Sequence, residues 1–333
     1  MAENKKRILT GDRPTGNLHL GHYVGSLANR VKLQKEYDSF ILIADVQALT
    51  THWEKGEDLS ENIFTIALDY LAVGIDPEIS TILIQSMIPE LCELTMYFSL
   101  YTSVNVLRHN PTIKSEAAQH GFKDMTYGFL GYPVSQAADI AIFKANLVPV
   151  GEDQVPHLEL ARKIVRRFND LYRPVLVEPD TLVGDVPRLV GLDGKTKMSK
   201  SLNNAIFLAD SSDIIKSKIR SAVTDPARIR KDDPGHPDIC TIFQYHKVFN
   251  NDEVTEIQTN CRQGSIGCVD CKNRLFNRLE QLQAPMRERR NKYANNMPLV
   301  REILYDGTSK ARSIAQDTMR EVRDAMQINY FNQ

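Results

Sequence analysis

The sequence lacks any long uncharged apolar run. A membrane-spanning helix needs about 18–20 consecutive apolar residues, and no stretch of this chain approaches that length. The first seven residues are mostly polar or charged, and only Ile8 and Leu9 follow before the polar Thr10 and Gly11, so the apolar core of a secretory signal is missing too. We therefore expect no membrane partner and a cytoplasmic location.

The sequence also has no excess of charge of either sign, and it has few cysteines. Lys and Arg number 41 against 42 Asp and Glu, a net charge of −1, which excludes a uniformly basic nucleic-acid coat but allows a basic face on one part. Five cysteines in 333 residues are few and odd in number, which disfavours a disulfide framework. The 42% apolar and 25% charged residues are typical of a globular protein, here of about two domains.

The first half of the chain alternates between short apolar runs and segments with helical periodicity. The runs predict strands at Lys6–Thr10, Phe40–Ala44, Thr81–Ile84, Leu147–Val150 and Pro174–Val177. The periodic segments predict helices at 22–36, 59–73, 90–107, 135–143 and 155–169. This order predicts an α/β fold with a doubly wound parallel sheet. Ligands bind such sheets at the carboxyl ends of the strands, where Asp45, Gln85 and residues 151–154 fall.

The character of the sequence changes after about residue 205. Helical segments are expected at 212–223, 252–260, 272–295 and 309–326, with no further strand. We therefore expect a catalytic domain over residues 1–204 and an all-α region over 205–333, whose last helix packs back on the first domain. The polar stretch Arg228–Asp238 is expected to be an exposed loop.

A first motif, Pro14-Thr-Gly-Asn-Leu-His-Leu-Gly-His22, lies between the first expected strand and the first expected helix. Helix N-termini bind anions through their unpaired N–H groups. Gly16 and Gly21 allow close approach of the backbone, and His19 and His22 can present two imidazoles to one phosphate. A surface turn with two histidines is the alternative reading of the same residues.

A second motif, Lys197-Met-Ser-Lys-Ser201, lies about 175 residues further on. Lysine ammonium groups act as point charges on phosphates, although such a run alone is more often a solvated loop. Together, the two motifs resemble the two signature sequences of class I aminoacyl-tRNA synthetases. Further segments resemble the tryptophan-specific enzymes of this class, and they lie at 11–16, 71–77, 137–140 and 148–154.

The resemblance implies ATP-dependent activation of an amino acid, with Mg²⁺ as the companion of ATP. It assigns the phosphate chemistry to His19, His22, Lys114, Lys197 and Lys200. It assigns further ATP contacts to Thr10, Gly11, Arg13, Gly21, Gly151, Asp153, Met198 and Ser199. In this reading Gly21 leaves room for the adenine ring.

The resemblance also implies a tryptophan pocket. An indole ring carries an N–H donor, and Asp139 is at the position that accepts it in this family. The other implied pocket residues are Leu9, Tyr132, Gln136, Val148, Val150 and Gln154. The implied products are tryptophanyl-adenylate and then tryptophanyl-tRNA, with tRNA(Trp) and L-tryptophan as partners and a homodimer as the assembly.

Four of the five cysteines cluster as Cys240, Cys261, Cys268 and Cys271. Four thiolates suit either Zn²⁺ or a [4Fe–4S] cluster, and the spacing alone does not decide between them. Resemblance to a bacterial subgroup of the tryptophan enzymes favours the [4Fe–4S] cluster. The remaining residue, Cys92, is expected to be buried in a helix.

Basic residues concentrate in the second half of the chain, and the resemblance implies that they form a tRNA-binding surface. They are Lys216, Lys218, Arg220, Arg228, Arg230, Lys231, Arg287, Arg289, Arg290 and Lys292.

Three other functions remain open at this point. A tyrosine-specific synthetase would place acceptors for a phenol hydroxyl. A small-molecule nucleotidyltransferase would leave the helical region and the cysteines unexplained. A non-catalytic paralogue is disfavoured by the intact His and Lys motifs.

Overall fold

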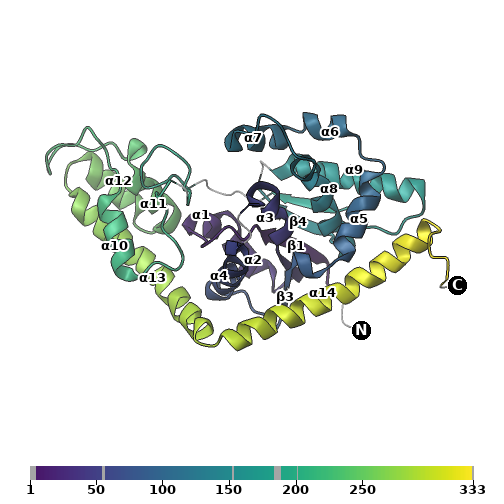
Figure 1. Cartoon of the computed structure of the whole chain (residues 1–333). Helices are drawn as coiled ribbons and strands as arrows, with labels where there is room; N and C mark the ends of the chain where they lie inside the picture. The colour runs from purple at the N-terminus through teal and green to yellow at the C-terminus, as the bar shows by residue number, and fades with distance from the viewer. Residues whose placement is uncertain (1–4, 55–56, 152–153, 184–188, 201, 332–333) are drawn as a thin grey trace.

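The computed structural model describes residues 5–54, 57–151, 154–183, 189–200 and 202–331. Its centre is a five-stranded sheet in the order β3-β2-β1-β4-β5, in which all neighbours are parallel. The strands are β1 (Arg7–Asp12), β2 (Asp38–Ile43), β3 (Ser80–Ile84), β4 (Leu147–Val150) and β5 (Asp180–Val183). Helices cover both faces of this sheet (Figure 1). The predicted doubly wound α/β class is confirmed.

Both faces of the sheet are buried, and β2 shows why its sequence is continuously apolar. Phe40 and Leu42 belong to one apolar cluster, with residues of α5 (Glu90–Ser99), α8 (Tyr127–Ile142) and α9 (Val155–Leu171). Ile41 and Ile43 belong to a second cluster, with residues of α4 (Glu57–Val73) on the opposite face. Successive side chains of a strand point to opposite faces, so a strand covered on both sides needs an apolar residue at every position.

The helix after the first motif is interrupted rather than continuous. It consists of α1 (Leu20–His22), a π-helical turn at Tyr23–Leu27, labelled η1, and α2 (Ala28–Leu33). The remaining helices of the sheet unit are α3 (Asp45–His52), α6 (Val104–His109) and α7 (Pro111–His120), with a short 3₁₀ turn, η2, at Gln85–Met87. Single π turns inside α-helices are frequent at functional sites.

Three local predictions in this unit are wrong. The helix expected over 90–107 is two helices, because Ser103 caps a new start with its side chain accepting from the backbone N–H of Asn105. Pro174–Val177 is no strand, since Asn169 Oδ1 accepts from the N–H groups of both Val175 and Leu176 at 3.1 Å. Cys92 is exposed on α5, whose buried side carries other residues, namely Leu91, Leu94 and Phe98.

Beyond residue 205 the regular elements of the described chain are all helices. Its elements are α10 (Ser212–Ser221), a 3₁₀ turn η4 (Pro237–Ile239), α11 (Thr241–Phe249), α12 (Val254–Arg262), α13 (Cys268–Ala294) and α14 (Met297–Ala325). Figure 1 shows α10–α12 and the start of α13 as a separate lobe beside the sheet, from which α13 descends to α4. The Arg289 guanidinium donates to the Ala72 carbonyl at 2.7 Å, and Arg290 pairs with Asp69 at 3.0 Å.

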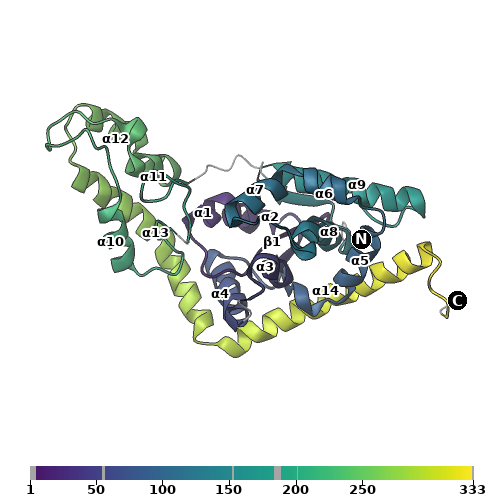
Figure 2. The ribbon, with the colours of Figure 1, turned by 45° about the horizontal axis from the view of Figure 1, so that its top comes forward.

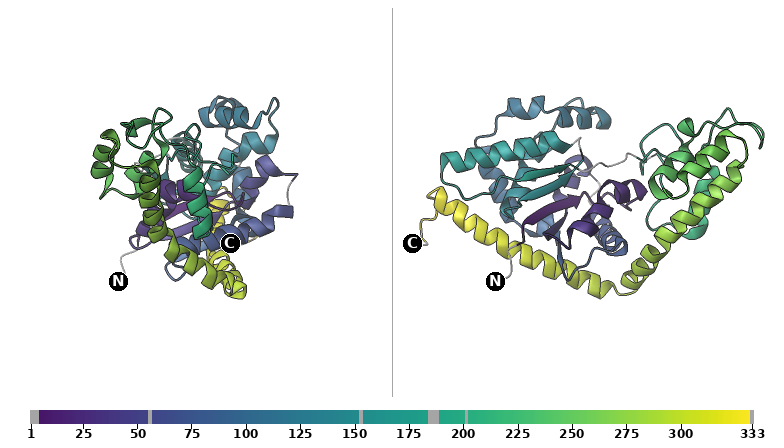
Figure 3. Two further views of the ribbon diagram at one scale, coloured as in Figure 1. Left: turned by 90° about the vertical axis from the view of Figure 1, so that its left-hand side faces the viewer. Right: turned by 180° about the vertical axis from the view of Figure 1, so that it is seen from behind.

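The last helix, α14, runs along the β3 edge of the sheet, as the view from behind shows (Figure 3). Thr308 accepts a hydrogen bond from the Ile84 N–H at 3.1 Å. A Cβ atom at Gly307 would stand 2.1 Å from the Ile82 carbonyl oxygen, so only glycine permits this approach. None of the described helices is both long and apolar enough to cross a membrane.

Candidate active site

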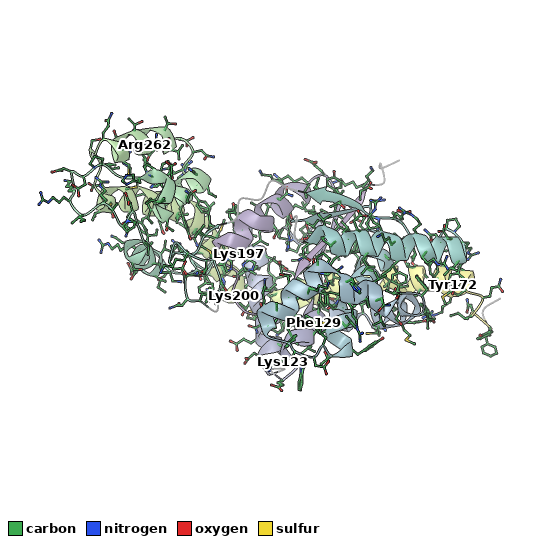
Figure 4. The ribbon with its side chains drawn as sticks, turned by 90° about the horizontal axis from the view of Figure 1, so that it is seen from above. Lys123, Phe129, Tyr172, Lys197, Lys200 and Arg262 are labelled. Carbon is green, nitrogen blue, oxygen red and sulfur yellow. The ribbon has the colours of Figure 1, made fainter. Side chains whose placement is uncertain are left out.

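The two signature motifs meet beside the carboxyl end of β1. His19 and Phe207 form an isolated antiparallel bridge, flanked by hydrogen bonds from Leu20 N–H to Ile206 and from Leu208 N–H to Leu18, each at 2.9 Å. This short pairing brings the segment after Ser201 against the first motif. Figure 4 shows Lys197 and Lys200 between the sheet unit and the helical lobe.

Lys200 contacts the first motif directly. Its ammonium donates to the Gly16 carbonyl at 2.8 Å and lies 3.4 Å from the Thr15 hydroxyl oxygen. Burial lowers the pKa of Lys200 to about 8, although the charges of Asp12 and Asp69 act to raise it. The side chain therefore remains mostly cationic at neutral pH. Lys197 is exposed, and its backbone forms an isolated antiparallel β-bridge with that of Val190.

The rings of His19 and His22 are in contact, with centroids 3.8 Å apart and planes inclined by 43°. Burial lowers the pKa of His19 to about 3 and that of His22 to about 4, with the nearby lysines adding to the effect. Both rings are therefore neutral at pH 7. His22 Nδ1 accepts from the His19 backbone N–H at 3.1 Å, so the proton of His22 is on Nε2, which can donate to a phosphate oxygen.

The backbone of Gly21 is in close contact with the His19 side chain. The His19 ring lies over it, and a Cβ atom there would be 2.9 Å from both Cε1 and Nδ1 of that ring. His19 Nδ1 is itself buried without a hydrogen-bond partner. Gly21 thus makes room for the imidazole, and the orphaned nitrogen is a polar atom that a bound ligand could satisfy.

Asn204 organises the second motif and was missed in the sequence. Its Oδ1 accepts from the Ser199 N–H at 2.8 Å, and its Nδ2 contacts Asp193 and Thr196 at 3.1 and 3.0 Å. Its amide also lies where a side chain on Gly191 would be. An asparagine after a lysine-rich run carries no distinctive signal, so only the fold reveals this role. Ser199 is half-buried and Met198 buried.

Arg30 and Tyr70 were also missed, and they hold Asp12 at the end of β1. Arg30 pairs with the Asp12 carboxylate at 2.6 Å, and the Tyr70 hydroxyl donates to it at 2.8 Å. Burial alone would raise the pKa of Asp12, but Arg30, with smaller effects from His22 and Tyr70, holds it below its usual value. A fixed negative charge therefore lies close to His22 and Lys200. Thr10 is buried, and Gly11 packs tightly against β2, with Leu42 O 2.2 Å from its ideal Cβ position.

The residues expected to bind tryptophan gather around β1, β4 and α8. Leu9, Tyr132 and Val148 belong to one apolar cluster, and Val150 packs against it. Tyr132 is fixed by a 2.7 Å hydrogen bond between its hydroxyl and His157 Nε2, a partner that the sequence did not suggest. Gln136 is half-buried with its Oε1 unpartnered, and Gln154 is half-buried at the start of α9.

Asp139 is 2% exposed in the interior of α8. Gln85, the first residue after β3, donates to both of its carboxylate oxygens at 2.9 Å. Burial raises the pKa of Asp139 to about 7, against the opposing hydrogen bond from Gln85, and the Asp45 carboxylate adds to the rise. Two of the residues expected at the strand ends, Asp45 and Gln85, therefore lie close to Asp139.

Arg13 links two elements above the sheet. Its guanidinium lies 3.4 Å from the Glu116 carboxylate on α7 and 5.2 Å from the centre of the Tyr132 ring on α8. Lys114 is exposed on the same helix, α7, which lies beside α6 and α9 (Figure 2). Gly151 is half-buried after β4, and the expected ATP residue Asp153 lies outside the described residues.

A separate cavity of about 800 Å³ lies between the α1–α2 segment and the helical lobe. Tyr23, Val24 and Val190 line one side, and Lys247 and Arg278 belong to the other. None of the expected tryptophan or phosphate residues lines it. It is therefore distinct from the site at the strand ends.

The four clustered cysteines come together in the helical lobe. Burial raises the pKa of the Cys271 thiol to about 12, and the three other thiols, Cys240, Cys261 and Cys268, add to the rise. Arg228 Nη1 lies 4.0 Å from Cys261 Sγ and 3.9 Å from Cys268 Sγ. Within the part of the chain that the structure describes, no three His, Cys, Asp or Glu side chains form the cage of a single metal ion.

The fold and the meeting of the two motifs define a class of protein. The chain belongs to the class I tRNA synthetases for tryptophan and tyrosine, whose family model matches residues 1–283. The tryptophan–tRNA ligases of Streptococcus agalactiae serotype V and Clostridium longisporum are each 51% identical to it. The first match covers 98% of this chain and 99% of the relative, and the second covers 98% of both.

A solved structure shares the whole fold. Tryptophanyl-tRNA synthetase from Campylobacter jejuni, complexed with ADP and tryptophan, matches with a TM-score of 0.86 and 33% identity, over 96% of this chain and 99% of that one. These matches confirm the resemblance to bacterial tryptophan-specific enzymes that the motifs indicated. They give no support to an iron–sulphur-bearing subgroup.

Proposed function

We infer that this chain is a tryptophan–tRNA ligase. It activates L-tryptophan with ATP, releasing pyrophosphate, and transfers the tryptophanyl group to tRNA(Trp). The observation that carries this conclusion is 51% identity over nearly the full length of both chains to ligases of this specificity. The paired motifs beside β1 support the same chemistry, whereas a nucleotidyltransferase reading leaves the helical lobe without a role.

The first step joins a tryptophan carboxylate oxygen to the α-phosphorus of ATP and breaks the bond from that phosphorus to the bridging oxygen. Negative charge then develops on the leaving pyrophosphate. His19 and His22 bind the phosphates as neutral imidazoles, and Lys197 and Lys200 supply positive charge. Lys114 adds a further cation from α7. This catalysis is positioning and electrostatic stabilisation.

Further residues of the sheet unit bind the nucleotide. Thr10, Gly11, Arg13 and Gly21 offer groups at the end of β1, Gly151 and Asp153 follow β4, and Met198 and Ser199 approach from the second motif. Mg²⁺ accompanies ATP and supplies charge neutralisation to its phosphates. The Nε2–H of His22 can donate to a phosphate oxygen. The Nδ1 of His19, which has no hydrogen-bond partner, can bind a polar atom of the ligand.

Tryptophan lies against the apolar cluster formed by Leu9, Val148 and Val150. Asp139 accepts the indole N–H, while Tyr132, Gln136 and Gln154 bind the ammonium and carboxylate groups. Support for this arrangement comes from burial, because Asp139 and Tyr132 are each 2% exposed. A buried acceptor imposes a penalty on amino acids that lack the N–H donor.

We assign ATP and tryptophan binding to residues 1–204 and tRNA anticodon binding to 205–333. Arg220, Arg230 and Lys231 are exposed in the helical lobe and suit phosphate contacts. Arg289 and Arg290 instead join α13 to the sheet unit, so they are removed from the expected tRNA surface. Because tRNA charging supplies the ribosome, we propose a cytoplasmic location.

The activity is tested by aminoacylation. Purified enzyme with ATP, Mg²⁺ and labelled tryptophan is expected to charge a tRNA(Trp) transcript and to leave a tRNA(Tyr) transcript uncharged. Adenylate formation without charging of any tRNA would favour the non-catalytic or regulatory paralogue. Charging of tRNA(Tyr) with tyrosine would establish the tyrosine-specific alternative.

We propose a [4Fe–4S] cluster, in preference to Zn²⁺, on Cys240, Cys261, Cys268 and Cys271. The donor chemistry fits, because four soft thiols lie near enough to raise one another's pKa, and Arg228 offers N–H donors to two of the sulfurs. The preference over Zn²⁺ rests on the resemblance to the bacterial subgroup with a cluster, because four thiols suit either group. The cluster would stabilise the lobe without taking part in the reaction.

Anaerobic purification followed by iron and sulfide analysis tests the cluster. We expect about four irons and four sulfides per chain, a loss of both in Cys268→Ser, and retention in the control Cys92→Ser, since Cys92 lies on α5 away from the lobe. One zinc per chain would replace the iron–sulphur assignment. A metal-free protein that keeps its thermal stability would overturn both.

We also propose that the enzyme is a homodimer, and that its interface includes the exposed apolar side chains around α5 and α6. Leu100 is 64% exposed, and Met96, Val104 and Val106, which are nearby in the chain, are exposed as well. Contiguous exposed apolar groups mark interaction surfaces. We expect Leu100→Arg to sediment as a monomer and Ile214→Arg, on the helical lobe, to remain dimeric. A dimeric Leu100→Arg protein would place the interface elsewhere.

A further inference from the structure

We propose that Gln85 is a specificity-determining positioning residue, which holds the Asp139 carboxylate in place to accept the indole N–H. This inference rests on the proposed role of Asp139 in tryptophan binding. Gln85 touches neither of the two signature motifs and was recognised in the sequence only as a residue at a strand end.

Both ends of the Gln85 amide are used. Its Nε2 donates to Asp139 Oδ1 and Oδ2, each at 2.9 Å, and its Oε1 accepts from the Gln47 backbone N–H at 3.1 Å. The second contact fixes which end of the amide faces Asp139. Gln85 is 3% exposed, so water competes little for these bonds.

The surroundings of Gln85 are rigid on both sides. Asp45 begins α3 and accepts from the N–H groups of Val46 and Ser86 through the same oxygen, at 3.0 and 2.9 Å. Asp45 thus ties the turn after β3, which carries Gln85, to the helix that carries Gln47. The ends of β2 and β3 therefore hold Gln85 against α8.

The charges explain why Asp139 needs this partner. A buried carboxylate is costly unless it is hydrogen-bonded, and the Asp45 carboxylate opposes its ionisation further. The two donations from Gln85 favour the ionised form, which is the stronger acceptor for an N–H group. A carboxylate has about four acceptor positions, so two donations leave room for the indole.

Loss of the Gln85 donor should affect the selectivity for tryptophan rather than the turnover. Without the Gln85 donor, the Asp139 carboxyl protonates more readily and loses its fixed orientation. Its attraction for an indole N–H falls, while the apolar contacts to the ring system remain. Discrimination between tryptophan and a sulfur analogue of the same shape, which lacks the N–H, should therefore decrease.

The test compares tryptophan with β-(3-benzothienyl)alanine in ATP–pyrophosphate exchange. For Gln85→Met, a similar-sized side chain without a donor, we expect the ratio of kcat/KM for tryptophan to that for the analogue to fall about tenfold. The KM for ATP and the kcat should change less than threefold. Gln85→Glu keeps an acceptor for Gln47 but lacks the amide donor, and its ratio should fall in the same direction.

Gln34→Met is the matched control. Gln34 is also a buried glutamine, 3% exposed, and it binds the start of β3 by accepting from the Ser80 hydroxyl at 3.0 Å. Its loss should lower the melting temperature and leave the selectivity ratio unchanged. If the selectivity ratio were similar in the wild type and in both Gln85 variants, while Asp139→Asn was still impaired toward tryptophan, the role of Gln85 would be overturned and that of Asp139 would stand. A normal ratio in Asp139→Asn would instead overturn the pocket assignment.

Discussion

Replacing Lys200 with alanine is expected to lower the kcat of tryptophan-dependent ATP–pyrophosphate exchange by about 10²–10³-fold, the usual loss when one group that stabilises transition-state charge is removed. The ammonium contacts the first motif, at 2.8 Å from the Gly16 carbonyl. It is held there by neutral groups, so it can turn to a pyrophosphate that carries far more charge. The KM for tryptophan should change less than threefold, since Lys200 contacts none of the pocket residues.

Lys195→Ala is the control for this prediction. Lys195 is exposed in the same loop. Its substitution removes the same charge from the protein but leaves the contact between Lys200 and the first motif in place. Its kcat should equal that of the wild type within a factor of two. Equal losses in both variants would mean that the loop contributes only general positive charge, and a loss below threefold in Lys200→Ala would remove Lys200 from the reaction.

Replacing Asp139 with asparagine is expected to reduce kcat/KM for tryptophan by about 10–100-fold, the cost of losing a charged acceptor for a buried donor. The amide keeps the volume and one carbonyl acceptor but carries no charge. Discrimination against phenylalanine should fall with it, because phenylalanine never used the acceptor. Unchanged discrimination against phenylalanine would contradict the assignment.

The pH dependence of the KM for tryptophan is an independent test of the role of Asp139. The pKa of Asp139 is raised to about 7, so its carboxylate is present above pH 7 and is lost as the pH falls through that value. The KM for tryptophan should therefore rise between pH 7 and 5.5 in the wild type and stay flat in Asp139→Asn. His19 and His22, with pKa values of about 3 and 4, and Lys200, at about 8, titrate outside this window.

Sequence patterns predict those parts of the fold that depend on local chemistry. The buried strand at Phe40–Ala44 is visible because a strand covered on both faces must be apolar at every residue. Pro174–Val177 has the same apolar appearance, but Asn169 takes the backbone groups that a strand would pair. That competition involves a side chain from the preceding helix, so a pattern search cannot detect it.

The site divides in the same way. His19, His22 and Lys200 were found because their spacing is distinctive, and the structure brings the two motifs together through the bridge between His19 and Phe207. Asn204 and His157 were missed, since each acts by contacting another residue rather than a substrate. A residue that positions another is identified by distances between elements that are remote in the sequence, and those distances come only with the fold.

Amino-acid-dependent ATP–pyrophosphate exchange across the twenty amino acids tests the central claim most directly. The account predicts exchange with tryptophan at least about 10³-fold above every other amino acid, because a site that hydrogen-bonds its substrate rejects those without the donor. Preferred exchange with tyrosine would keep the phosphate chemistry of His19, His22 and Lys200 and contradict the specificity. No exchange with any amino acid, from folded enzyme supplied with ATP and Mg²⁺, would contradict the claim that this chain is an amino-acid-activating enzyme.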